Sequence, residues 1–188
     1  MVAKDVKEDK HFPLFVHYNP VRRLFFSNPK KYCQYVSHGH VVADLGCGPG
    51  YFTFSLADAV GPKGTVYAVD SDPKAIHALR KRAEKRGYKN IQMFPSSATD
   101  LGFIKDGLVD FVLADGLLCS MAPQHQDAAT REIQRILKPD AVAYLKVAEG
   151  SWSYVGLAEW QNLLEGFKII QKSDATHGGG RWAVVSKK

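Results

Sequence analysis

The chain has 188 residues, of which 45% are hydrophobic and 23% are charged. This is enough for one well-packed core and too little for two independent domains, and the composition excludes a globally disordered chain. No apolar run approaches the roughly 18 residues that a membrane-spanning helix needs. The charged start, MVAKDVKEDKHF, is not a secretory signal. We therefore expect a single compact domain without a membrane span, located in the cytoplasm.

The formal net charge is +6, and part of the excess lies in one basic cluster on an expected helix, Arg80, Lys81, Arg82, Lys85 and Arg86. Such a cluster can attract RNA phosphates, although a solvated outer face is the more ordinary interpretation. The three cysteines, Cys33, Cys47 and Cys119, are too scattered for a disulfide framework and lack the paired spacing of a zinc site. The sequence therefore predicts reduced thiols and no metal site.

From about residue 40 onward, short apolar runs alternate with helical patterns. The runs predict seven strands, at His40–Leu45, Thr65–Val69, Ile91–Phe94, Val109–Ala114, Ala141–Val147, Phe167–Ile170 and Trp182–Val185. Helical spacing predicts helices between them, at Phe52–Val60, Pro73–Arg86 and Gln124–Leu137, the last stopped by Lys138–Pro139. This alternation predicts an α/β fold, a mostly parallel sheet with helices on both faces.

The two ends of the chain depart from the alternation. Residues 172–181 form a glycine-rich connection without a helix, which predicts a terminal hairpin and hence an antiparallel last strand. Residues 1–40 form an N-terminal arm or lid and a helix before the domain of residues 41–188. The arm carries the aromatic residues Phe12, Phe15, Tyr18, Phe25 and Phe26.

The sharpest motif is VADLGCGPG at residues 42–50, where a buried strand runs through Asp44 into a glycine loop and then a helix. Glycines at 46, 48 and 50 permit a tight turn and let a ligand approach backbone N–H groups. The helix that follows favours an anionic group at its N-terminus. The pattern is G-x-G-x-G, which differs from the G-x-G-x-x-G of dinucleotide-binding proteins.

Asp70 ends the second predicted strand, twenty residues after Gly50. A carboxylate at this position can accept hydrogen bonds from both hydroxyls of a ribose. An acid at a strand end often only caps the next helix, but Asp72 precedes Pro73 and can do so instead. The loop and Asp70 together favour a ligand that contains a nucleoside.

Residues 41–148 resemble the class I S-adenosylmethionine-dependent methyltransferases. The likeness is carried in order by the glycine loop and by the segments YAVDSDP, FPSSATDLGF, VDFVLADGLL and RILKPDAVAYLKV. It is greatest for the small-molecule branch that includes the ubiquinone/menaquinone-biosynthesis and arsenite methyltransferases. The resemblance implies a Rossmann-like, seven-stranded sheet in the order 3-2-1-4-5-7-6, with the last strand antiparallel, and S-adenosylmethionine as cofactor.

The resemblance also implies roles for individual residues. Asp44 and the loop residues Gly46, Cys47, Gly48 and Gly50 would hold the methionine end of the cofactor. Asp70 would bind the ribose, and Ser71 would lie beside the adenine. Relatives usually have Gly-Asp-Ala where this chain has Ser96, Ser97 and Ala98. Ser97 would then accept a hydrogen bond from the adenine amino group without a charge, and the Ala98 N–H would meet a ring nitrogen.

Asp115, at the end of the fourth predicted strand, would face the sulfonium and the methyl acceptor. It is a candidate general base, an electrostatic partner of the cation or a positioning group, and the alternative is an ordinary exposed acid at a strand end. His125 and His177 each follow a strand that should end near the acceptor, or they are ordinary loop histidines. The resemblance to the small-molecule branch implies a small-molecule acceptor.

Two alternatives remain open. RNA ribose 2′-O-methyltransferases of the heat-shock type also have an aspartate after strand four and a lysine on strand five, which Asp115 and Lys146 match. Lys30 or Lys31 could stand for a further upstream lysine, but GGGRWAVV replaces the acid expected near the final strand. The second alternative is a catalytically weak S-adenosylmethionine-binding protein that acts through a partner, and Ser97 is its support.

Overall fold

The computed structural model of the chain describes residues 7–10, 28–148, 150, 153–174 and 180–188. The five aromatic residues expected in the N-terminal arm, and His177, lie outside the described residues. Among the helices that the structure describes, none has the length and apolar character needed to cross a membrane.

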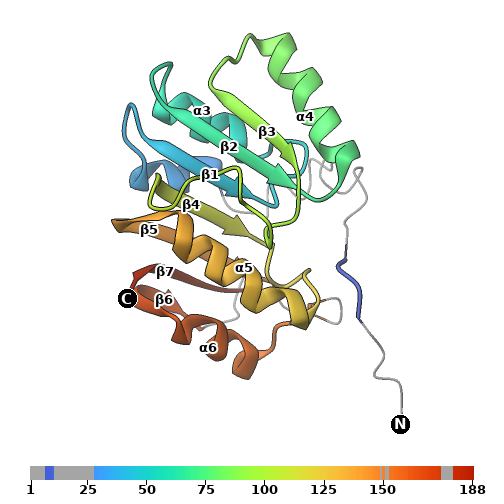
Figure 1. Cartoon of the computed structure of the whole chain (residues 1–188), viewed down its shortest axis with the longest axis vertical. Helices are drawn as coiled ribbons and strands as arrows, with labels where there is room; N and C mark the ends of the chain where they lie inside the picture. Colours follow the sequence, from blue (N-terminus) through green and yellow to red (C-terminus); the bar gives the residue numbers. More distant parts are fainter. Residues whose placement is uncertain (1–6, 11–27, 149, 151–152, 175–179) are drawn as a thin grey trace.

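The described elements follow the predicted alternation (Figure 1). In chain order they are η1 (Pro29–Tyr35), β1 (Val41–Leu45), α3 (Thr53–Val60), β2 (Thr65–Asp70), α4 (Pro73–Arg86), β3 (Ile91–Pro95), β4 (Val109–Asp115), α5 (Pro123–Ile136), β5 (Leu137–Val147), α6 (Leu157–Glu165), β6 (Phe167–Ser173) and β7 (Arg181–Lys187).

Within the described residues, seven strands form one sheet in the order β3-β2-β1-β4-β5-β7-β6. The pairs from β3 to β5 are parallel, whereas β7 runs antiparallel to both β5 and β6. The predicted fold class and strand order are therefore confirmed. Because β1, β2, β4 and β5 are parallel, their carboxyl ends meet at one edge of the sheet, which we call the carboxyl edge.

Helices cover both faces of the sheet. On one face α3 and η1 pack on β1, β4 and β5, and α4 packs beside them through Ile76 and Leu79 against Ala68. On the other face α5 and α6 bury Ile133 and Trp160. Alternate residues of each central strand therefore enter one core or the other, as expected for a parallel sheet that is covered twice.

The local sequence explains how α4 begins and ends. The Asp72 carboxylate accepts the Lys74 N–H at 2.8 Å, Pro73 occupies the first turn, and Gly87 ends the helix with φ +75°. An acidic N-cap, an early proline and a left-handed glycine after the last turn are each favoured at these positions. The expectation that Asp72 caps this helix is confirmed.

The boundary between α5 and β5 differs from the prediction. The helix ends at Ile136, and β5 begins at Leu137 instead of Ala141, so Lys138–Pro139 lies inside the strand. The pairing of β4 with β5 is irregular between Val109 and Phe111. A proline, which has no N–H to donate, is tolerated at such an irregularity, and the chain therefore passes from helix to strand without a loop.

Candidate functional site

The three predicted acids lie at the carboxyl edge, at the ends of neighbouring strands. β1 lies between β2 and β4. The strands that follow β1 in the chain are added on one side of it, up to β3, and the later strands are added on the other side, from β4 onward. Asp44 is near the end of β1, whereas Asp70 and Asp115 are the last residues of β2 and β4. In open α/β sheets a ligand binds at such a reversal of strand order. The topology therefore places the candidate site here.

The glycine loop turns tightly away from the end of β1. The N–H groups of Gly46 and Cys47 both donate to the Val69 carbonyl oxygen, at 2.8 and 3.1 Å. Gly46, Gly48 and Gly50 have φ values of +75°, +53° and +91°, where other residues are strained. A Cβ added at Gly50 would also collide with the Leu79 side chain. The three glycines are therefore needed for the shape of this loop.

Asp70 fastens the loop to β2. Its Oδ2 accepts the Gly48 N–H at 2.8 Å, and its Oδ1 accepts the Asp72 N–H at 2.9 Å. Each carboxylate oxygen has a second lone pair, so both can accept a further hydrogen bond. Asp70 thus fits the part of a ribose-binding acid while it also holds the glycine loop.

Asp44 is buried, with 2% of its surface exposed, and the Thr53 hydroxyl donates to its Oδ2 at 2.6 Å. Burial raises the pKa of Asp44 to about 7, and the charges of Asp70 and Asp115 add to the rise while the Thr53 hydrogen bond opposes it. A cationic group beside this carboxylate would favour its ionised form. The site therefore fits a ligand that presents an ammonium group to Asp44.

The other predicted loop residue, Cys47, is buried, and burial raises the pKa of its thiol well above the usual range. Its Sγ donates to the Gly48 carbonyl oxygen at 3.5 Å. The neutral thiol therefore packs within the loop, and Cys47 can meet a ligand through its backbone.

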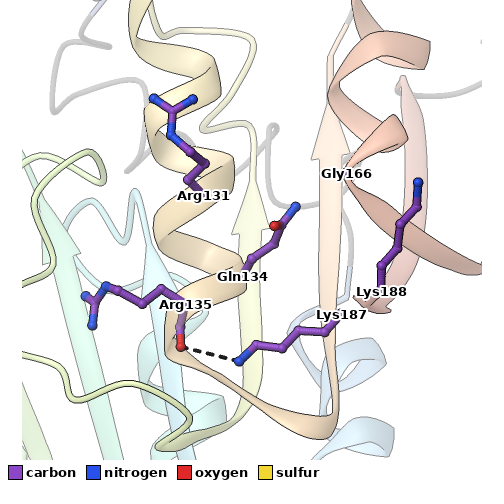
Figure 2. Close-up of a pocket in the computed structure, with 6 residues that line it drawn as sticks. All are labelled: Arg131, Gln134, Arg135, Gly166, Lys187 and Lys188. Carbon is purple, nitrogen blue, oxygen red and sulfur yellow. Dashed lines mark hydrogen bonds between the residues drawn. The ribbon is translucent and has the colours of Figure 1, made fainter.

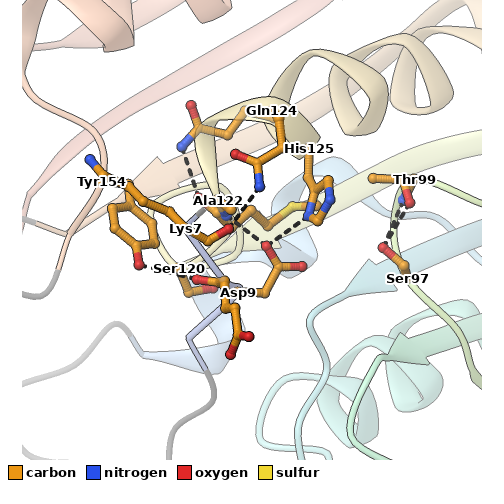
Figure 3. A network of polar contacts seen from close by, with 12 residues as sticks. Lys7, Asp9, Ser97, Thr99, Ser120, Ala122, Gln124, His125 and Tyr154 are labelled. Atoms are coloured by element: carbon orange, nitrogen blue, oxygen red, sulfur yellow. Dashed lines mark hydrogen bonds and ion pairs between the residues drawn. The ribbon is translucent and has the colours of Figure 1, made fainter. Parts of the chain in front are cut away.

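The residues expected near the adenine follow β2 and β3. Ser71 is exposed directly after Asp70, and Ala98 is buried. The Ser97 Oγ accepts the Thr99 N–H at 3.2 Å and lies 2.9 Å from the Thr99 hydroxyl, as Figure 3 shows. Thr99 thus already uses much of the hydrogen-bonding capacity of the Ser97 hydroxyl, and its contact with an adenine stays a prediction.

Asp115 lies in a compact polar cluster on the other side of β1. Its Oδ2 accepts the Tyr32 hydroxyl at 2.5 Å, and Lys146 Nζ is 3.8 Å from its Oδ1. Lys31 Nζ donates to the Tyr144 hydroxyl at 2.7 Å. We call these five residues the acceptor cluster. The side chains of Asp115 and Lys146 are each 12% exposed and both tyrosines are buried, whereas Lys31 is exposed at the edge of the cluster.

Burial shapes the electrostatics of the acceptor cluster. It lowers the pKa of Lys31, and nearby Lys146 lowers it further while Asp115 opposes the change. Burial is also the largest cause that raises the pKa of Tyr144, with Asp115 adding to it. The cluster therefore holds two ammonium groups, one carboxylate and two phenols beside one another.

The sequence pointed to Asp115 and Lys146 and named Lys31 among upstream lysines, but it missed Tyr32 and Tyr144. Tyr144 precedes Lys146 by two residues on β5, so the same face of the strand presents both, and this spacing was an available signal. Tyr32 is on η1, 83 residues before Asp115, and no local pattern marks it.

A surface pocket lies elsewhere, lined by Arg131, Gln134, Arg135, Gly166, Lys187 and Lys188 (Figure 2). It lies where α5 and β7 end, which is the edge of the sheet opposite the carboxyl edge. Arg135 is held there by Glu132 at 2.7 Å and Asp106 at 2.6 Å. None of the predicted site residues lines this pocket.

Comparison with known proteins agrees with this geometry. A family model described as a methyltransferase domain matches residues 37–174. An uncharacterized 37.1 kDa protein in transposon TN4556 of Streptomyces fradiae is 30% identical over 142 residues, 73% of this chain and 35% of that protein. Demethylmenaquinone methyltransferase of Geobacillus stearothermophilus is 29% identical over 107 residues, 57% of this chain and 44% of the enzyme.

Among solved structures, a SAM-dependent methyltransferase from Aquifex aeolicus superimposes with a TM-score of 0.74 at 23% identity. The match covers 92% of this chain and 95% of that one, and it supports the fold. The chain spans less than half the length of the two curated relatives described above, 35% and 44%.

Proposed function

The chain belongs to the methyltransferase-domain family, in its class I, S-adenosylmethionine-dependent form, and we propose that it transfers the cofactor's methyl group to a small-molecule acceptor. The observation that carries the proposal is the contact between Asp70 and Gly48, which joins the predicted ribose-binding acid to the predicted cofactor loop. The relative named demethylmenaquinone methyltransferase supports a small-molecule acceptor.

When bound, S-adenosylmethionine supplies a methyl group on a positively charged sulfonium. In this proposal Asp44 and the backbone of the glycine loop hold its methionine end. Asp70 accepts hydrogen bonds from the ribose hydroxyls, and Ser71 and Ala98 lie beside the adenine. The buried carboxylate of Asp44 suits binding of the methionine end, because the α-ammonium of the cofactor would supply a positive charge beside it and favour its ionised form.

Asp115 then faces the reacting atoms from the acceptor side. The Tyr32 hydroxyl fixes one of its carboxylate oxygens, and Lys146 lies 3.8 Å from the other. A carboxylate held in one orientation, in a site with little water, attracts a developing or resident positive charge strongly. We assign Asp115 this electrostatic and orienting part, together with proton acceptance for any acceptor that must lose a proton.

One observation favours a second candidate, a ribose 2′-O-methyltransferase acting on RNA. Lys31, Asp115 and Lys146 all belong to the acceptor cluster. Basic residues of α4, a possible phosphate-binding surface, are also exposed, at Arg80, Lys81, Lys85 and Arg86. Against this candidate, the residue opposite Lys146 on β7 is Trp182, where an acid would be expected nearby.

The experiment that separates these candidates starts with binding of S-adenosylhomocysteine, measured by titration calorimetry. The chain is then incubated with methyl-labelled S-adenosylmethionine and a cell extract, and the extract is divided into small molecules, RNA and protein. Label in the small-molecule fraction is the expected result, whereas label that ribonuclease releases would favour the second candidate. If S-adenosylhomocysteine does not bind, and Asp70→Ala makes no difference to that result, both candidate functions are rejected. Binding without transfer would favour a catalytically weak binding protein.

A further inference from the structure

Residues 7–10, which we call the N-terminal strap, lie against the beginning of α5 (Figures 1 and 3). The Lys10 N–H donates to the Ser120 carbonyl oxygen at 2.8 Å. The Asp9 Oδ1 accepts the Ala122 N–H at 2.6 Å and is 2.9 Å from His125 Nδ1. The strap is therefore held by the segment that joins β4 to α5, more than a hundred residues along the chain.

The strap also contacts the segment that follows β5. The Tyr154 hydroxyl donates to the Glu8 carbonyl oxygen at 3.1 Å, and Lys10 Nζ lies 3.9 Å from the centroid of the Tyr154 ring. The Tyr154 N–H in turn donates to the Cys119 carbonyl oxygen at 2.9 Å. The strap thus joins the connections that leave β4 and β5, both of which start at the carboxyl edge.

Asp9 accepts a backbone N–H at the start of α5. The N-cap residue of α5 is Ala122, whose side chain cannot accept a hydrogen bond from the first turn. A carboxylate at this position satisfies a helix N–H and interacts favourably with the positive end of the helix dipole. Because Asp9 lies 113 residues before Ala122, the carboxylate accepts this N–H only while the strap is in place.

The segment beneath the strap is continuous with the candidate site. Residues 116–122 begin directly after Asp115, and the Gly116 N–H donates to the Lys146 carbonyl oxygen at 2.9 Å. The Leu117 side chain packs so closely on the glycine loop that a Cβ added at Gly46 would lie 3.3 Å from its Cδ1. This segment therefore connects Asp115 to the residues that the strap holds, and it packs on the glycine loop through Leu117.

We propose that Asp9 is a positioning residue for methyl transfer, which holds the strap on α5 and thereby fixes residues 116–122 as the wall of the acceptor site. The inference rests on the proposed function. It requires that loss of the Asp9 carboxylate impair use of the acceptor while binding of the cofactor product is preserved.

Cys119 provides a direct readout of the wall. It is buried in the segment under the strap, its Sγ lies 3.4 Å from the Ala148 N, and burial raises its pKa to about 11, so it reacts slowly with alkylating agents. In Asp9→Ala we expect iodoacetamide to modify Cys119 at least fivefold faster than in the unchanged chain. Peptide mass spectrometry measures the rate. Buried Cys47 in the cofactor loop is the internal control and should keep its rate.

The matched control variant is Glu8→Ala, which removes the same charge from the strap, since the described contact of Glu8 is made by its backbone. It should behave as the unchanged chain. Asp9→Asn keeps an oxygen that can accept the Ala122 N–H and should lie between the two, which provides a test if Asp9→Ala does not fold. Equal Cys119 rates in all four proteins, or a parallel rise for Cys47, would overturn the inference.

Two further measurements separate this inference from the proposed function. S-adenosylhomocysteine should bind Asp9→Ala within twofold of the unchanged chain, while transfer of labelled methyl to the extract falls at least fivefold. If Cys119 is alkylated faster but the transfer of labelled methyl is unchanged, Asp9 has a structural role only, and its positioning role is overturned. Failure of the unchanged chain to bind S-adenosylhomocysteine would reject the proposed function, whatever the rate at Cys119.

Discussion

The two sides of the carboxyl edge are assembled over very different distances in the sequence. On the cofactor side, Asp70 holds Gly48 from 22 residues away, across a single strand–helix–strand unit. On the acceptor side, Tyr32 reaches Asp115 over 83 residues, and the strap reaches α5 over 113. The cofactor side is thus a local structure, whereas the acceptor side depends on segments that meet only in the folded chain.

This difference suggests that the two sides can change independently. Local contacts keep the glycine loop in shape without the N-terminal residues, so substitutions on the acceptor side should leave cofactor binding nearly intact. Distant residues that share no partner usually contribute additively to free energy. Single substitutions on either side can test this separation.

Asp70→Ala should produce the largest loss, more than about 100-fold in affinity for S-adenosylhomocysteine. Hydrogen bonds to a charged acceptor contribute about 1.5–3 kcal/mol each, and the substitution removes those to the ribose as well as the one that holds Gly48. Titration calorimetry gives the affinity. Asp100→Ala, an exposed acid after β3, is the control and should change it less than twofold. A loss below fivefold for Asp70→Ala would mean that Asp70 does not bind the ribose.

Asp115→Asn should reduce transfer of labelled methyl about 100-fold, the usual scale for removing one preorganised charged group. S-adenosylhomocysteine, which has no sulfonium charge, should bind within threefold of the unchanged chain. Asp127→Asn, an exposed position on α5, is the control. Equal losses in transfer and in S-adenosylhomocysteine affinity would show that the two sides are not separable at Asp115.

The same contrast explains what the sequence could predict. The glycine loop, Asp70 and Asp72 lie within one strand–helix–strand unit, so their types and spacing reveal their arrangement. Tyr32 and Asp9 contact residues that are far away in the sequence, and no local sequence pattern around either one indicates its partner. One signal was available: Ala122 precedes a helix that begins with proline and has no capping side chain, so an acceptor from another segment is favoured at this end of the helix.

The predicted start of β5 shows a second limit. Lys138–Pro139 predicts the stop of the preceding helix, and the apolar run predicts a strand only from Ala141. In the structure, the irregular pairing between Val109 and Phe111 accommodates these residues, and the strand starts at Leu137. Irregularities of this kind depend on the neighbouring strand and are therefore not visible in the sequence of one strand alone.

The pH dependence of cofactor binding should report on the ionisation of Asp44. The folded chain raises the pKa of this carboxyl from its usual 3.8 to about 7, so the neutral form predominates below pH 7. Its contribution to folding stability is therefore present below pH 4 and is lost as the pH rises through 7. A bound ammonium group favours the ionised form, and affinity for S-adenosylhomocysteine should increase about tenfold from pH 6 to pH 8.

Calorimetry in two buffers of different ionisation enthalpy should show a proton released on binding near pH 6. Asp44→Asn cannot ionise and should show neither the release nor the pH dependence. Asp115→Asn should keep both, with the pH dependence moved to lower pH, because the charge of Asp115 is only a minor cause of the raised pKa of Asp44. Loss of the pH dependence in Asp115→Asn would instead mean that the acceptor cluster controls the ionisation of Asp44.

Ser97→Asp should produce the smallest change, about a threefold gain in affinity for S-adenosylhomocysteine. Ser97 Oγ already accepts the Thr99 N–H, whereas a carboxylate has enough lone pairs to accept both that group and the adenine amino group. One net hydrogen bond contributes about 0.5–1.5 kcal/mol. The gain should disappear with S-inosylhomocysteine, whose base lacks the amino group, and Ser96→Asp is the matched control. An equal gain for both ligands would mean that residue 97 acts by charge and not by recognition of adenine. The residues that bind the cofactor would then be Asp44, the glycine loop and Asp70.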